Sequence, residues 1–96
     1  MFKGAYTALI TPFTVDHGID QAGLEKLVEF QVDQGISGVL AVGTTGESPT
    51  LDWEEHDSVT ETVCSIVRGR AQSIAGTGSN STKETMRATE HAAHAG

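Results

Sequence analysis

Two adjacent threonines between glycines are the residues of this sequence best suited to bind a small ligand. Thr44 and Thr45 lie in the stretch GTTGES (43–48), which joins an apolar run to an amphipathic one. Glycines beside a strand end allow backbone N–H groups to converge on an anion, and the N-terminus of a following helix adds positive potential. The Thr45 hydroxyl could donate to the same anion, and a carboxylate, which accepts at two oxygens, fits such a cradle.

Thr44 could take a different role, because a hydroxyl both donates and accepts and can relay a proton between neighbouring hydroxyls. It is too weakly basic to act as a general base alone. We expect Glu47 to accept hydrogen bonds from backbone N–H groups rather than to act as an acid catalyst. A plain glycine-bracketed turn explains the stretch equally well. Neither phosphate-binding pattern, GxxxxGK[ST] or GxGxxG, is present in the loop.

A second group of polar and aromatic residues lies at the starts of two predicted helices. Trp53 and His56 are three residues apart and therefore share a helix face. Together the group offers an acid, an amide, an imidazole and an aromatic face, which suits an amino acid with a cationic side chain. The alternative is structural, with packing by the two rings and a capping box at the later helix. The six candidates are Ser48, Pro49, Trp53, His56, Asn80 and Glu84.

Three other residue types have simpler explanations. Cys64 falls inside a helical pattern without an activating partner, so we expect it to pack in the core. His91 and His94 have a spacing that can bind metal, but no third ligand is evident, and we expect a solvated helix end and no metal site. His17, between Asp16 and Gly18, is typical of a turn.

The elements that must position these residues repeat one unit: an apolar strand, a glycine- and threonine-rich loop, and a capped helix. The predicted strands are 6–13, 38–43 and 72–78. Asp20 caps the first helix and Gly35 ends it, whereas capping boxes start the second helix (Asp52 with Glu55) and the third (Ser81 with Glu84). The third helix has a thin apolar face of Met86, Ala88, Ala92 and Ala93. Such a repeat predicts a parallel sheet with ligand chemistry at the strands' carboxyl ends. A doubly wound sheet and part of a (β/α)8 barrel both fit.

Size and composition narrow the classes of function. The net charge is −7, which argues against a nucleic-acid-binding protein. One cysteine fits a reducing compartment, and no apolar run approaches the ~20 residues of a membrane helix, so we expect a cytoplasmic protein. Three parallel strands are too few for either architecture and would leave unpaired edges. We therefore expect residues 1–96 to be part of one larger domain, without an internal boundary.

Three stretches together resemble a known family. GAYTALITPF (4–13), GVLAVGTTGESPTLDWEEH (38–56) and IAGTGSNST (74–82), in this order and spacing, resemble the start of the pyruvate-dependent class I aldolases, the dihydrodipicolinate synthase and N-acetylneuraminate lyase family. The resemblance extends over essentially the whole chain and about the first third of the family's usual length. It implies a (β/α)8 TIM barrel of which this chain forms about the first three βα units. The paired threonines favour the synthase branch, because the lyases tend to carry serine and threonine.

The resemblance also implies a function for the full-length protein. The synthases are cytoplasmic homo-oligomers, dimers of dimers, and need no cofactor. They condense pyruvate, held as a lysine Schiff base, with L-aspartate 4-semialdehyde to 4-hydroxy-tetrahydrodipicolinate in lysine and diaminopimelate biosynthesis. Thr45 matches the threonine that binds the pyruvate carboxylate, and Thr44 matches a hydroxyl of the proton relay. The six candidates of the second group match an allosteric site for lysine at a dimer interface, with Trp53 resembling the plant-type version.

The Schiff-base lysine of the family has no counterpart in these residues. It follows a later strand, as do the relay tyrosines and the arginine for the second substrate. An imine-forming lysine needs a desolvated pocket, whereas Lys3 precedes the first strand and Lys26 and Lys83 lie on predicted helix faces. We expect the 96 residues alone to be inactive. The alternatives are a sibling aldolase for N-acetylneuraminate or a 2-keto-3-deoxy sugar acid, and a non-catalytic truncated product.

Overall fold

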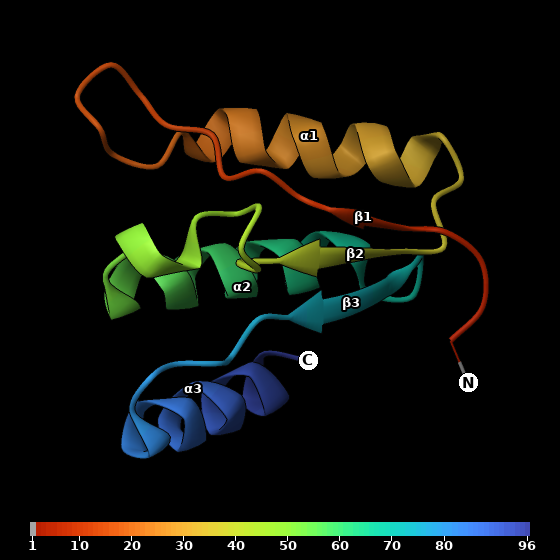
Figure 1. The fold of residues 1–96 in the computed structure, drawn as a ribbon. Coiled ribbons are helices and arrows are strands. Elements are labelled where there is room, and N and C mark those ends of the chain that lie inside the picture. The colour runs from red at the N-terminus through yellow and green to blue at the C-terminus, as the bar shows by residue number, and fades with distance from the viewer. Residues whose placement is uncertain (1) are drawn as a thin grey trace.

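The computed structural model describes residues 2–96, which form three parallel strands alternating with helices (Figure 1). Thr7 of β1 pairs with Val39 of β2, which pairs in turn with Ser73 of β3. The strand–helix repeat predicted from the sequence is therefore confirmed. The elements in chain order are β1 (Tyr6–Ala8), α1 (Gln21–Asp33), β2 (Gly38–Ala41), the 3-10 helix η1 (Ser48–Thr50), α2 (Trp53–Val67), β3 (Gln72–Ala75) and α3 (Thr82–Ala95).

All three strands are shorter than predicted, most clearly β1, which ends at Ala8 rather than at residue 13. The Leu9 N–H still donates to the Leu40 carbonyl (2.9 Å), after which the chain leaves the sheet. Pro12 has no N–H to contribute to a ladder, and the Thr11 hydroxyl instead binds the loop that follows β2. Leu9 and Val42, which follow β1 and β2, belong to the buried core.

Local capping signals position the first two helices as predicted. Asp20 accepts a hydrogen bond from the Gly23 N–H (2.9 Å), and Gly35, at φ +83°, follows the end of α1. The capping box of α2 is complete, since Asp52 accepts from the Glu55 N–H (2.8 Å) and Glu55 accepts from the Asp52 N–H (3.1 Å).

The predicted capping box of α3 is only half formed. The Ser81 hydroxyl accepts from the Glu84 N–H at 3.4 Å. The Glu84 carboxylate does not return a bond to Ser81, because the Ser79 hydroxyl donates to it at 2.7 Å. Ser79, in the preceding loop, therefore takes the place of the Ser81 N–H as the donor to the Glu84 carboxylate.

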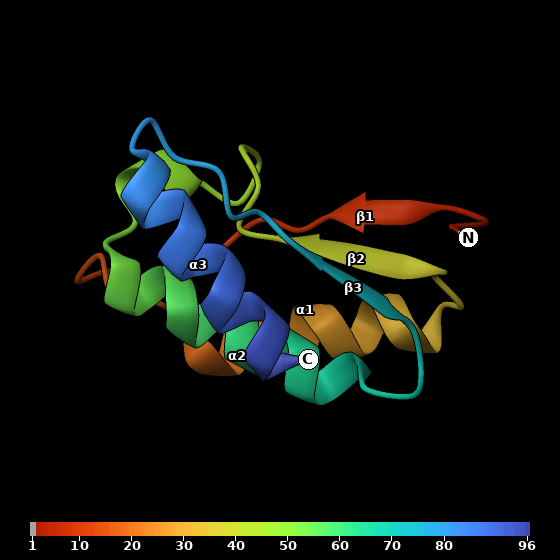
Figure 2. The same ribbon diagram turned by 90° about the horizontal axis from the view of Figure 1, so that it is seen from below.

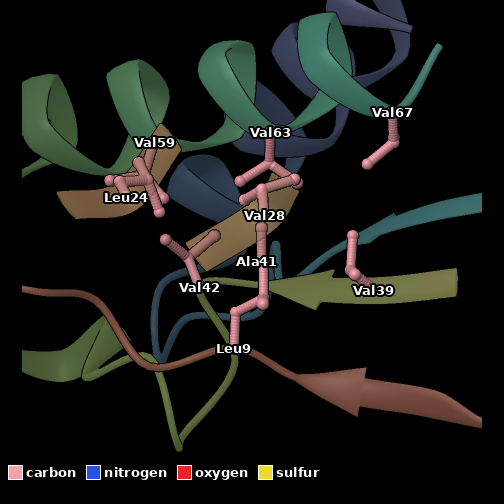
Figure 3. Close-up of a cluster of buried hydrophobic side chains, with 9 residues drawn as sticks. All are labelled: Leu9, Leu24, Val28, Val39, Ala41, Val42, Val59, Val63 and Val67. Atoms are coloured by element: carbon pink, nitrogen blue, oxygen red, sulfur yellow. The ribbon is translucent and has the colours of Figure 1, made fainter. Parts of the chain in front are cut away.

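The core lies between the sheet and two helices (Figure 3). β2 contributes Val39 and Ala41, and branched side chains of α1 and α2 cover them from the helical side. The remaining members of the cluster are Leu9, Leu24, Val28, Val42, Val59, Val63 and Val67. Cys64 is buried beside this cluster, as predicted.

α3 packs on α2 through a narrower contact than predicted. Ala88 is buried, whereas Met86 is 68% exposed and Ala93 is also exposed, so the expected apolar face is wrong at these two positions. A helix with small residues can approach α2 closely, and polar contacts between the two helices complete the interface.

The helices cover one face of the sheet and leave the opposite face bare of helix (Figure 2). Ile10, which follows β1, is 57% exposed. In the part of the chain that the structure describes, β1 and β3 each pair on one side only. None of the helices within residues 2–96 combines the length and apolar character needed to cross a membrane.

Candidate functional site

The GTTGES loop is clamped between the ends of β1 and β3. Thr11 is a buried residue three positions after the end of β1, and its hydroxyl donates to the Gly46 carbonyl at 2.7 Å. A Cβ at Gly46 would lie 3.1 Å from the Leu9 carbonyl, and a Cβ at Gly76 would lie only 2.4 Å from the Val42 carbonyl. Two glycines on different segments therefore permit the close backbone approach that holds the loop.

The loop and the residue that precedes it contain two non-glycine residues in the left-handed region. Val42 has φ +48° and Glu47 has φ +62°. Positive φ is unusual for a β-branched residue and costs about 1–3 kcal/mol, so the surrounding contacts must hold Val42 in place. Val42 is buried in the core cluster, and its carbonyl lies against Gly76. The conformation of the loop is thus imposed by packing with neighbouring segments.

The predicted role of Glu47 is wrong for its side chain. Within residues 2–96 the Glu47 carboxylate makes no capping hydrogen bond and is exposed. Its backbone carbonyl instead accepts from the Thr50 N–H (2.9 Å) and the Thr50 hydroxyl (3.0 Å).

Thr44 and Thr45 are both exposed at the carboxyl end of the sheet. Among the described residues their hydroxyls have no hydrogen-bond partner, and the Thr44 carbonyl accepts from the Glu47 N–H (3.0 Å) to close the turn. The helix that directly follows is the short η1, and α2 begins only at Trp53. The expected helix N-terminus therefore does not adjoin the threonines directly.

A pocket of about 400 Å³ lies beside this loop, between η1 and the starts of α2 and α3. All six residues predicted for the second group line it, which confirms that the fold brings them together. Leu51, Gly78 and Ser79 also line it and were not predicted. Ser79 could have been found from the sequence, since it is next to Asn80 and five residues before Glu84.

The pocket has an aromatic wall, formed by Trp53 and His56, and an acidic side, formed by Glu84. His56 is 2% exposed, and its Nε2 lies 2.7 Å from the Gly76 carbonyl. The Trp53 and His56 rings pack edge to face with centroids 4.8 Å apart. Glu84 supplies a carboxylate whose position is fixed by Ser79. This arrangement offers a cationic ligand one carboxylate, one amide and an aromatic surface.

Asp57 and Arg87 connect the helices behind the pocket and were also missed. Arg87 donates to Asp57 through Nη1 (2.9 Å) and Nη2 (3.1 Å). The hydrogen bond from Arg87 lowers the pKa of Asp57, opposed in part by burial and supported by the nearby His91. The two residues are 30 positions apart, so no local pattern links them.

The remaining candidates lie apart from the strand ends. Lys3, Lys26 and Lys83 are exposed, before β1 and on helices, as expected. His91 is not simply solvated, since its Nε2 lies 3.1 Å from the Glu61 carboxylate. His17 has φ +69°, and its N–H donates to the Thr14 carbonyl, which confirms the turn. No group of three or more His, Cys, Asp or Glu side chains within residues 2–96 is placed to hold a metal.

Curated relatives match all or most of the chain. It is 54% identical over 96 residues to 4-hydroxy-tetrahydrodipicolinate synthase of Syntrophus aciditrophicus, covering 100% of this chain and 33% of that protein. It is 55% identical over 86 residues to the enzyme of the same name from Methanocaldococcus jannaschii, covering 90% of this chain and 29% of that protein. The chain thus spans about one third of the length of the curated relatives that it matches.

Solved structures match the fold. A chloride-inhibited dihydrodipicolinate synthase from Acinetobacter baumannii, complexed with pyruvate, superposes with a TM-score of 0.95 at 43% identity, covering 100% of this chain and 33% of that one. The synthase of Cyanidioschyzon merolae with lysine bound gives 0.92 at 39% (99% and 33% covered). An N-acetylneuraminate lyase from Mycoplasma synoviae gives 0.92 at 35% (98% and 32% covered).

These structural neighbours are (β/α)8 barrels, and the three strand–helix units described above correspond to the first units of that barrel. The sequence profile of the dihydrodipicolinate synthetase family matches residues 1–96. The chain therefore belongs to the dihydrodipicolinate synthetase family.

Proposed function

We propose that these residues form the N-terminal third of a parent lyase that condenses pyruvate with L-aspartate 4-semialdehyde to 4-hydroxy-tetrahydrodipicolinate. One observation carries the proposal: a strained, packed loop holds Thr44 and Thr45 exposed at the carboxyl end of the sheet. Barrel enzymes bind their substrates at the carboxyl ends of their strands. The A. baumannii relative, which shares the fold, is complexed with pyruvate.

In the proposed site Thr45 donates its hydroxyl to the pyruvate carboxylate. A hydrogen bond to a charged acceptor stabilises a complex more than a hydrogen bond between neutral groups does. The same bond orients the pyruvate ketone for attack. Because packing already holds the loop backbone in place, little backbone entropy is lost when the substrate binds.

Thr44 passes a proton between neighbouring hydroxyls of the parent enzyme. Formation of an imine from a lysine Nζ and the C2 carbonyl of pyruvate releases water, and the reaction moves protons to and from oxygen and nitrogen along the way. A hydroxyl that donates and accepts at once can complete such a relay. The imine-forming lysine is supplied by the parent outside residues 1–96.

We place a lysine effector in the pocket lined by Ser48, Pro49, Trp53, His56, Asn80 and Glu84. Glu84 pairs with a ligand ammonium, and the polar side chains and Trp53 fix its orientation. The C. merolae relative has lysine bound. The parent is also proposed to be a cytoplasmic homotetramer, in which a second subunit closes this pocket, and the single domain continues past residue 96.

An activity comparison tests the reaction. The parent protein is assayed with pyruvate plus L-aspartate 4-semialdehyde, with pyruvate plus N-acetylmannosamine, and with pyruvate plus a sugar-derived aldehyde. We expect the highest kcat/KM for the semialdehyde. Faster turnover with either sugar aldehyde would assign the protein to a sibling activity, and no reaction with any aldehyde would favour a non-catalytic product. Unchanged turnover at millimolar lysine would contradict the effector proposal.

A further inference from the structure

Arg87 reaches from α3 to two residues of α2 at once. Its guanidinium forms two hydrogen bonds with Asp57, and its Cζ lies 5.0 Å from the centroid of the Trp53 ring. Trp53 and Asp57 are four residues apart on α2, so their side chains lie on one face. Arg87 therefore contacts the aromatic ring with a guanidinium that the carboxylate holds in a fixed plane.

The Trp53 ring is held on two sides. The His56 ring packs against it edge to face, and His56 is itself fixed by the Gly76 carbonyl. Arg87 supplies the second contact without lining the pocket. Removing it would leave the indole freer to turn about its side-chain bonds, because one of its two ring contacts would be lost.

Asp57 also determines how the charge of Arg87 acts on the pocket. Its hydrogen bond is the largest cause that raises the pKa of Arg87, and Glu84 adds a smaller Coulombic contribution. Two hydrogen bonds hold the guanidinium on Asp57, whereas the only side-chain hydrogen bond that Glu84 makes among the described residues is to Ser79, so its carboxylate stays accessible to a cationic ligand. Without Asp57, the guanidinium would be free to approach Glu84 and oppose a cationic ligand.

We propose that Arg87 is a positioning residue of the pocket: paired with Asp57, it fixes the Trp53 ring and thereby sets the affinity for a ligand with a cationic side chain. The statement about affinity depends on the effector proposal above. The statement about the ring does not, and it is measurable in the absence of ligand.

The test uses the parent protein and a matched control. Arg70 forms a similar pair of hydrogen bonds with Glu29 (3.0 and 2.7 Å), and its side chain is 40% exposed against 45% for Arg87. Within the described residues Arg70 makes no cation–π contact, and it does not line this pocket. Arg87→Ala and Arg70→Ala therefore remove comparable ion pairs, and only the first removes a contact to Trp53.

The first measurement is acrylamide quenching of Trp53, taken as the difference between each protein and its Trp53→Phe counterpart. Arg87→Ala should raise the quenching constant, and Arg70→Ala should leave it at the wild-type value. Equal quenching in all three proteins would overturn the proposal whether or not lysine binds.

The second measurement is calorimetric binding of lysine. Arg87→Ala should weaken binding by about threefold to tenfold, the scale of the cation–π contact that fixes the Trp53 ring. In a Trp53→Ala background it should cause no further loss, because Arg87 acts through the ring. Additive losses would show that Arg87 acts independently of Trp53. If the wild-type parent fails to bind lysine, the effector proposal fails. The quenching result alone then decides whether Arg87 fixes the Trp53 ring.

Discussion

At the scale of single residues, Thr44 and Thr45 have similar surroundings and different proposed roles. Both are exposed, and neither hydroxyl has a partner within the described residues. Valine is close to threonine in shape and lacks the hydroxyl, so it separates chemistry from folding. The two substitutions should therefore affect different kinetic constants.

Thr44→Val in the parent should lower kcat by about 100-fold, the scale of one acid–base contribution, because the proton relay is broken. The midpoint of thermal unfolding should change little, since Thr44 contributes no packing to the core. Thr44→Ser keeps the hydroxyl and should retain most of the activity. An unchanged kcat in the valine variant would rule out the relay.

Thr45→Val should raise the KM for pyruvate by about 10-fold, the loss expected for one hydrogen bond to a charged group. Steady-state kinetics with pyruvate varied at saturating aldehyde measure it, provided that KM follows the substrate affinity. The KM for the aldehyde should stay near the wild-type value. A decrease in kcat alone would instead assign Thr45 to the chemical step.

At the scale of elements, the loop after β2 depends on glycine at position 76. A Cβ there would meet the Val42 carbonyl at 2.4 Å, whereas a Cβ at Gly78 meets nothing within 4 Å. Gly76→Ala should lower the free energy of unfolding by about 1–3 kcal/mol, the usual cost of overpacking, and should reduce pyruvate affinity. Gly78→Ala is the control and should leave the free energy of unfolding unchanged. Equal effects in a urea titration would show that the close approach is not needed.

The contact between α2 and α3 should depend on pH through Asp57. Arg87 holds the pKa of Asp57 below its ordinary value of 3.8. A lowered pKa in the folded state stabilises the protein above the unfolded pKa, and this stability is lost as the pH falls through the folded value. Asp57→Asn should therefore lower the free energy of unfolding by about 0.5–1 kcal/mol near neutral pH and by nothing in strong acid. A difference that persists in strong acid would contradict the assignment.

Local signals explain which of these features the sequence could predict. Asp20 and the Asp52–Glu55 box lie within three residues of their partners, and both helix starts were predicted correctly. The half-formed cap at Glu84 was mispredicted because Ser79 competes for its carboxylate. The residues of the pocket were predicted as a group, mainly through the family resemblance.

Features that depend on distant segments could not be predicted. The left-handed backbone of Val42 is imposed by contacts with the segment after β3. The pairing of Arg87 with Asp57 requires the relative position of two helices. Neither follows from the pattern of residues along one element, because the cause lies in tertiary packing.

At the scale of the whole molecule, the chain supplies one part of a barrel site. The threonine loop lies at the carboxyl end of a sheet of three parallel strands, and helices cover one face of this sheet (Figure 2). The lysines of this part, Lys3, Lys26 and Lys83, are all exposed, so none has the desolvated surroundings that favour a neutral amine. The proposed chemistry therefore requires a lysine from the rest of the parent barrel.

Borohydride trapping with pyruvate, followed by peptide mapping, tests this division most directly. Reduction of the imine fixes the pyruvate carbon skeleton to the reacting lysine, and mass spectrometry then locates it. In the parent protein we predict one adduct, on a lysine outside residues 1–96, and no adduct on the 96-residue chain treated alone. An adduct on Lys3, Lys26 or Lys83, or no adduct on the parent, would contradict the account.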